Sequence, residues 1–140
     1  DTVYSRIIEL GEPSDLVDLA KDGRRRIGVD QLKAQGLPWE KAKGFDGAAV
    51  IGKWVPKDRF EDLGDLHFSL SKNGEVVQEG STGNMLWGID EIIAYCSSFF
   101  TLKKGDIIFT GTPAGVGQVA PNDYLSGSLE GEELFSLKVR

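Results

Sequence analysis

Two hydroxyl side chains lie in a glycine-rich stretch, Thr110-Gly-Thr-Pro-Ala-Gly-Val-Gly117, which follows the apolar run Ile107-Ile-Phe109. Glycines let a backbone approach a ligand closely, and loops that follow buried strands often carry binding groups. Thr110 and Thr112 therefore indicate a candidate binding loop. A plain turn after a core strand explains the same pattern, because loop signals of this kind are common. The stretch lacks the Gly-Lys-Ser/Thr ending of a phosphate-binding P-loop.

His67 and Cys96, the single residues of their types, are weak candidates for catalysis. His67 stands at a polar position between Leu66 and Phe68, so strand alternation predicts that it points away from the core. Cys96 falls on the apolar face of an expected helix, where a free thiol packs as a small hydrophobic group. A Ser-His-Asp hydrolase and a zinc site of His and Cys ligands are therefore disfavoured. Carboxylates remain as ligands for a hard metal ion such as magnesium.

The elements that must hold these residues are mostly short strands. Alternation predicts a strand at 66–70, Asn73-Gly74 predicts a type I′ turn, and 75–79 is the returning strand. Apolar residues at helical spacing predict one amphipathic helix with a buried face from Ile89 to Phe100.

The two ends of the chain are less regular. Residues 107–109 and parts of 123–139 read as further strands, with turns at Gly127 and Gly131. Upstream, a strand at 3–10, a helix at 12–20 and a short helix at 29–35, ended by Gly36, are expected. A mostly β order with one clear helix predicts an α+β fold, and the length suits a single domain spanning 1–140.

Composition narrows the class of protein further. The chain of 140 residues has a formal net charge of -6, which argues against a general nucleic-acid binder. No apolar stretch approaches the roughly 20 residues that span a bilayer, so no membrane partner is expected. A single Cys excludes an internal disulfide and fits a reducing compartment, so a cytoplasmic location is expected.

A set of motifs in fixed order resembles the fumarylacetoacetate hydrolase family, most of all its acylpyruvase and oxaloacetate decarboxylase branch. They are Gly36-Leu-Pro-Trp39, Lys41-Ala-Lys-Gly-Phe-Asp46, Asn73-Gly-Glu75, Gln78-Glu-Gly80, Asn84-Met-Leu-Trp87 and the Thr-Gly-Thr-Pro loop. The resemblance is dense from Gly36 to Arg140. It implies a mixed β-roll of the family's C-terminal type, shortened at its N-terminal side, with an atypical segment at 1–21.

The resemblance also implies roles for six residues. Asp22 and Glu9 would bind a divalent cation, Mg²⁺ or Mn²⁺. Arg26 and Lys43 would be catalytic, Lys43 contacting the substrate as well. Gly111 and Thr112 would bind the substrate carboxylate.

The chemistry implied by the family is cleavage of a C–C bond beside a 1,3-dicarbonyl, through a metal-stabilised pyruvate enolate. The substrate would be a small 2-oxo or 2,4-dioxo acid: an acylpyruvate or fumarylpyruvate for hydrolysis, or oxaloacetate for decarboxylation. Lys43 would add positive charge near the keto oxygen. The resemblance further implies a homodimer.

Several departures from the family pattern keep a second function open. The family's Glu-x-Glu metal strand is matched only by Ile7-Ile-Glu9, with Ile7 in the first Glu position. Val29 replaces a family Gln, and the family's lid with its water-activating His and Glu has no counterpart here. The alternative is therefore a non-catalytic or truncated member that keeps the fold and at most binds a dicarboxylate.

Overall fold

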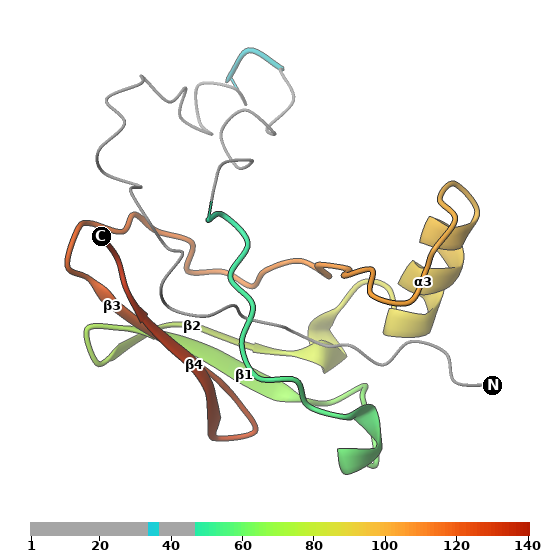
Figure 1. The fold of residues 1–140 in the computed structure, drawn as a ribbon, viewed down its shortest axis with the longest axis horizontal. Helices are drawn as coiled ribbons and strands as arrows, with labels where there is room; N and C mark the ends of the chain where they lie inside the picture. The colour runs from blue at the N-terminus through green and yellow to red at the C-terminus, as the bar shows by residue number, and fades with distance from the viewer. Residues whose placement is uncertain (1–33, 37–46) are drawn as a thin grey trace.

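The computed structural model describes residues 34–36 and 47–140. Their centre is an antiparallel sheet of four strands in the order β2-β1-β3-β4 (Figure 1). The strands are β1 (His67–Lys72), β2 (Glu75–Ser81), β3 (Tyr124–Leu129) and β4 (Glu132–Lys138). In the figure the long segment after α3 runs along the sheet before the chain enters β3.

The β1–β2 hairpin confirms the predicted strands and turn. Asn73 and Gly74 have φ of 55° and 87°, the positive values that a type I′ turn requires at both central positions. The strands pair from His67 opposite Ser81 to Lys72 opposite Glu75. The register shifts between Leu70 and Ser71, so the ladder contains a β-bulge.

The β3–β4 hairpin confirms one of the two predicted C-terminal turns. Glu130 and Gly131 have φ of 49° and 78°, and they join the two strands. The turn predicted at Gly127 is wrong, because Gly127 is a buried residue inside β3 opposite Phe135. A Cβ atom at Gly127 would lie 1.7 Å from the Phe135 ring. This glycine therefore makes room for an aromatic ring on the neighbouring strand.

A small apolar cluster covers one end of the sheet. Its buried members are Val55, Leu66, Leu129 and Leu134, with Phe60, Leu63 and Phe68 packed against them. Thr82 ties the entry of β1 to the exit of β2, because its hydroxyl donates to the Leu63 carbonyl and accepts from the Leu66 N–H. The short 3-10 turns η2 (Lys57–Arg59) and η3 (Thr82–Asn84) flank this cluster.

The helix α3 (Ile89–Ser97) confirms the predicted amphipathic helix, but its burial is shallower than expected. The Glu91 carboxylate accepts a hydrogen bond of 2.8 Å from the Gly88 N–H, and acidic groups in the first turn suit the helix dipole. Residues on the expected inner face are half-buried, and Phe99 and Phe100 beyond the helix end are each 68 % exposed. The prediction of a continuous buried face is therefore wrong at its C-terminal end.

The strand predicted at 107–109 is also wrong. Residues 107–120 form an extended loop without a strand, although Ile107 and Ile108 are half-buried. A strand needs a hydrogen-bonded neighbour as well as suitable residues, and this segment joins no ladder of the described sheet.

The elements predicted at 3–10 and 12–20 lie outside the described residues. Of the helix predicted at 29–35, only Ala34, which is helical, and Gln35, which lies in a turn, are described. Gly36 has φ of 64°, the left-handed conformation that commonly ends a helix. The described residues combine an antiparallel sheet with a helix, as an α+β fold requires; the mixed β-roll stays a prediction.

Candidate functional site

The Thr110–Gly117 loop is held against β2 by one side chain, Gln78. Its Nε2 donates to Thr112 Oγ1 at 3.1 Å, to the Pro113 carbonyl at 3.1 Å and to the Ala114 carbonyl at 3.3 Å. Carbonyl oxygens only accept hydrogen bonds, so the amide nitrogen of Gln78, and not its oxygen, must face the loop. The loop thereby receives a fixed anchor on a strand of the sheet.

Two glycines bring the loop and the strand into close contact. Gly115 has φ of 97°, and a Cβ atom there would lie 2.1 Å from the Val77 carbonyl oxygen. A Cβ atom at Gly80 on β2 would lie 2.7 Å from the Phe68 ring and 3.2 Å from Pro113. A side chain at Gly115 would push the loop away from β2, and one at Gly80 would first meet the Phe68 ring.

Further hydrogen bonds hold the end of the same segment. Lys72 Nζ donates to the Gln118 carbonyl at 3.1 Å. The Asp123 carboxylate accepts from Asn73 Nδ2 and from the Ala120 N–H, each at 2.8 Å. The bond from Asn73 most of all, and then the bond from Ala120, lower the pKa of the Asp123 carboxyl. The segment is thus held by the middle of β2, through Gln78, and by the turn of the β1–β2 hairpin, through Lys72 and Asn73.

The fixed loop presents donors to open space. Thr112 and Gly111 are exposed, Gly111 has φ of 120°, and no atom lies within 4 Å of where its Cβ would stand. Because Thr112 Oγ1 accepts from Gln78, its own hydroxyl proton is free to donate. Among residues 34–36 and 47–140, the N–H groups of Gly111 and Thr112 find no acceptor. An anionic group such as a carboxylate is the ligand that these donors suit.

Gln78 is a site residue that the sequence analysis missed as a functional candidate. It lies in the Gln78-Glu-Gly80 motif, so the signal was present. A half-buried Gln in a strand requires a partner for its amide, which is a reason to search for one.

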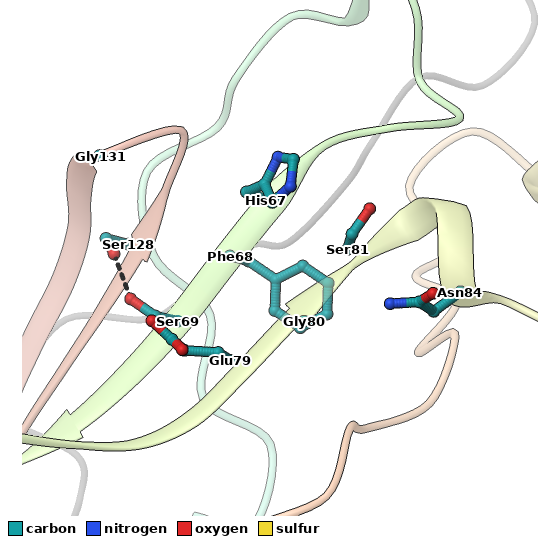
Figure 2. Close-up of a pocket in the computed structure, with 9 residues that line it drawn as sticks. All are labelled: His67, Phe68, Ser69, Glu79, Gly80, Ser81, Asn84, Ser128 and Gly131. Atoms are coloured by element: carbon teal, nitrogen blue, oxygen red, sulfur yellow. Dashed lines mark hydrogen bonds between the residues drawn. The ribbon is translucent and has the colours of Figure 1, made fainter.

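A hollow lies between β1, β2 and the β3–β4 turn (Figure 2). Glu79, which lines it, follows Gln78 on β2, and strand alternation places these two side chains on opposite faces of the sheet. It is shallow and open, with a volume of about 460 Å³. Ser69 and Ser128 share a hydroxyl hydrogen bond of 2.8 Å on its floor. The residues that line it are His67, Phe68, Ser69, Glu79, Gly80, Ser81, Asn84, Ser128 and Gly131.

His67 stands at the rim of this hollow, as predicted, with its side chain 69 % exposed. Its ring nitrogens lie 4.0 Å from Asp65 and 3.6 Å from Glu130, both beyond hydrogen-bond range. Its backbone N–H donates to the Glu130 carboxylate. The arrangement contains no hydroxyl held by the imidazole, so nothing here resembles a nucleophile and its base.

The remaining predicted site residues, Glu9, Asp22, Arg26 and Lys43, lie outside the described residues. Within the described part of the chain, no three His, Cys, Asp or Glu side chains are grouped so that they could hold a metal ion. Cys96 is half-buried, so the prediction of a packed thiol holds only in part. A search of the same residues finds no helix long and apolar enough to cross a membrane.

The comparisons with known proteins agree on one family. Residues 19–136 match the family model described as fumarylacetoacetate hydrolase C-terminal. The chain is 43 % identical over 121 residues to the mitochondrial oxaloacetate tautomerase of Homo sapiens, covering 86 % of this chain and 55 % of that protein. It is 37 % identical over 129 residues to the mitochondrial oxaloacetate decarboxylase of Dictyostelium discoideum, covering 90 % and 59 %.

Solved structures show the same relationship. Fumarylpyruvate hydrolase from Pseudomonas aeruginosa, in complex with Mn²⁺ and pyruvate, matches with a TM-score of 0.70 and 35 % identity. The match covers 79 % of this chain and 47 % of that one. The chain thus spans about half the length of the curated relatives it matches.

Proposed function

Because the chain belongs to the fumarylacetoacetate hydrolase family, we propose that it acts on oxaloacetate or a related 2,4-dioxo acid by stabilising a pyruvate enolate. Its relatives are named oxaloacetate tautomerase, oxaloacetate decarboxylase and fumarylpyruvate hydrolase. Tautomerisation, decarboxylation and hydrolytic cleavage of such acids share an electron pair delocalised onto the keto oxygen at C2. One site that stabilises that charge serves all three reactions.

The observation that carries this proposal is the donor surface of the Thr110–Gly117 loop. Thr112 and Gly111 are both exposed on a loop that Gln78 fixes, and the Thr112 hydroxyl accepts from Gln78 and so keeps its own proton for a ligand. A 2-oxo acid presents a carboxylate with several acceptor lone pairs, and hydrogen bonds to an ionised acceptor are the stronger kind. In this role the loop holds the carboxylate end of the substrate.

The other roles fall to residues outside the described part of the chain. Asp22 and Glu9 supply carboxylate oxygens, the donor type that Mg²⁺ and Mn²⁺ prefer. A divalent cation held there supplies positive charge that favours the enolate. Lys43 adds a second positive charge for the same oxygen, and Arg26 neutralises or orients the bound anion.

Decarboxylation of oxaloacetate makes a smaller demand on these groups than hydrolysis of an acylpyruvate. The bond between C3 and the C4 carboxylate breaks, CO₂ leaves, and its electron pair becomes the enolate of pyruvate. A proton from solvent at C3 then completes pyruvate. Hydrolysis of an acylpyruvate needs an activated water in addition, whereas conversion of the enol to the keto form removes a proton from the C2 oxygen and adds one at C3.

The proposal is tested by assaying the purified protein with oxaloacetate and acetylpyruvate, with and without EDTA. The disappearance of the oxaloacetate enol, CO₂ release and pyruvate formation are followed separately. We expect activity that EDTA abolishes and added Mg²⁺ or Mn²⁺ restores. Turnover that is unaffected by chelation would contradict the metal-dependent mechanism.

A second candidate is a non-catalytic protein that binds a dicarboxylate. The observation that favours it is that Ile7 stands where the family pattern has the first Glu of its Glu-x-Glu metal strand. Calorimetry with oxalate, a mimic of the enolate, separates the two. Metal-dependent oxalate binding together with turnover supports the enzyme, whereas oxalate binding without turnover of either acid supports the binding protein.

A further inference from the structure

We propose that Gln78 is a positioning residue that sets the donor geometry of Thr112 for the substrate carboxylate. This inference rests on the proposed function and assigns a role to a residue outside the predicted site. Gln78 lies on β2, three hydrogen bonds join its amide nitrogen to consecutive residues of the loop, and the loop has no strand of its own.

The β-bulge in the β1–β2 hairpin sets the direction of this side chain. Gln78 pairs with Leu70, and the next paired residues are Val76 and Ser71, so Val77 is the extra residue. A bulge re-aims the neighbouring side chains of its strand. The Val77 carbonyl meets the loop at Gly115, beside the Gln78 amide. The bulge at Val77, the glycine at 115 and the Gln78 amide together form one contact between β2 and the loop.

The bonding pattern decides what Thr112 can do. If the Gln78 oxygen faced the loop, Thr112 would donate its proton to that oxygen and keep none for a ligand. The Pro113 and Ala114 carbonyls exclude this orientation, because their oxygens and the Gln78 side-chain oxygen are all acceptors and none of them could donate a hydrogen bond. The Gln78 amide therefore satisfies the loop carbonyls and leaves the Thr112 proton for an anion.

The test compares Gln78→Met with Glu79→Met in the purified protein. Methionine keeps the length of both side chains and removes their polar ends. Glu79 is exposed, next in sequence, and lines the hollow on the opposite face without bonding the loop, so it controls for the substitution itself. A third variant, Gln78→Lys, keeps a donor at the same position.

We expect Gln78→Met to raise KM for oxaloacetate and Kd for oxalate roughly tenfold, the effect of losing one well-placed hydrogen bond. The value of kcat should change by less than about threefold, because the donor acts on ground and transition states alike. NMR order parameters of Gly111–Gly117 should fall in the substrate-free protein. Glu79→Met should match the wild type, and Gln78→Lys should recover part of KM.

Two results overturn the inference while leaving the proposed function intact. One is an active wild type in which Gln78→Met has unchanged KM and unchanged loop order parameters. The other is a lowered melting temperature with unchanged KM, which makes Gln78 a purely structural residue. A wild type that neither turns over nor binds oxalate instead refutes the proposed function, and the substrate role of Gln78 with it.

Discussion

At the residue scale, Thr112 and Lys43 carry different parts of the proposed chemistry. Thr112 offers one hydroxyl proton to a carboxylate that is present before and during the reaction, so its loss weakens binding throughout. Lys43 is assigned to charge that develops only as the bond breaks. The two residues should therefore separate in their effects on KM and kcat.

We predict that Thr112→Val raises KM with little change in kcat, and that Lys43→Met lowers kcat by about 10²–10³-fold with little change in substrate affinity. Steady-state kinetics with oxaloacetate measures both, and thermal melting serves as the control. Unfolding of both variants, with full activity in the fraction that stays folded, would show that these residues are structural.

The sequence identified the residues of this site unevenly. Thr112 and Gly111 are predicted as site residues because the Thr-Gly-Thr-Pro motif is a local pattern. The role of Gln78 was missed because it depends on a contact between residues 34 positions apart in the chain. Only the fold reveals which strand a loop rests on.

At the element scale, a prediction was correct where neighbouring residues decide the structure and wrong where a distant strand decides it. Asn73-Gly74 fixed its hairpin correctly because a type I′ turn is decided by its two central residues. The strand expected at 107–109 failed because strand formation depends on a distant partner. Likewise, the turn predicted at Gly127 is wrong, because this residue lies in β3 and its lack of a side chain leaves room for the Phe135 ring of the next strand.

The contact between the loop and β2 gives an element-scale prediction. Gly115→Ala adds a Cβ where the Val77 carbonyl leaves no room, at a φ that L-residues rarely adopt. The loop should move away from β2, and the protein should lose about 1–3 kcal/mol of stability together with oxalate affinity. Gly105→Ala is the control, because its φ is also positive while nothing lies within 4 Å of the added atom. Equal effects of the two substitutions on oxalate binding would contradict the role of the contact.

At the scale of the whole molecule, several large apolar side chains of the described residues are exposed between Leu86 and Phe109. Leu86 is 98 % exposed, Phe99 and Phe100 are each 68 % exposed, and Phe109 is 65 % exposed. Ring contacts from Trp87 to Tyr95 and from Tyr95 to Phe99, with centroids 5.0 and 5.1 Å apart, extend this surface along α3. Exposed apolar surface of this kind is typical of sites that bind another protein chain.

The expected partner is a second copy of the chain. The sheet supports this expectation as well. Its described edge strands are β2 and β4, and an edge strand can pair with a strand of another chain. We predict a dimer in light scattering after size exclusion. The double substitution Phe99→Ser/Phe100→Ser should shift the species toward monomer because it removes two large apolar groups from the surface.

Val76→Ser, at a residue 58 % exposed on the edge strand β2, tests the sheet edge separately. If only Val76→Ser dissociates the dimer, the copies pair through the sheet edge and not through the aromatic surface. A stable monomer of the unaltered protein at high concentration would refute self-association by either route.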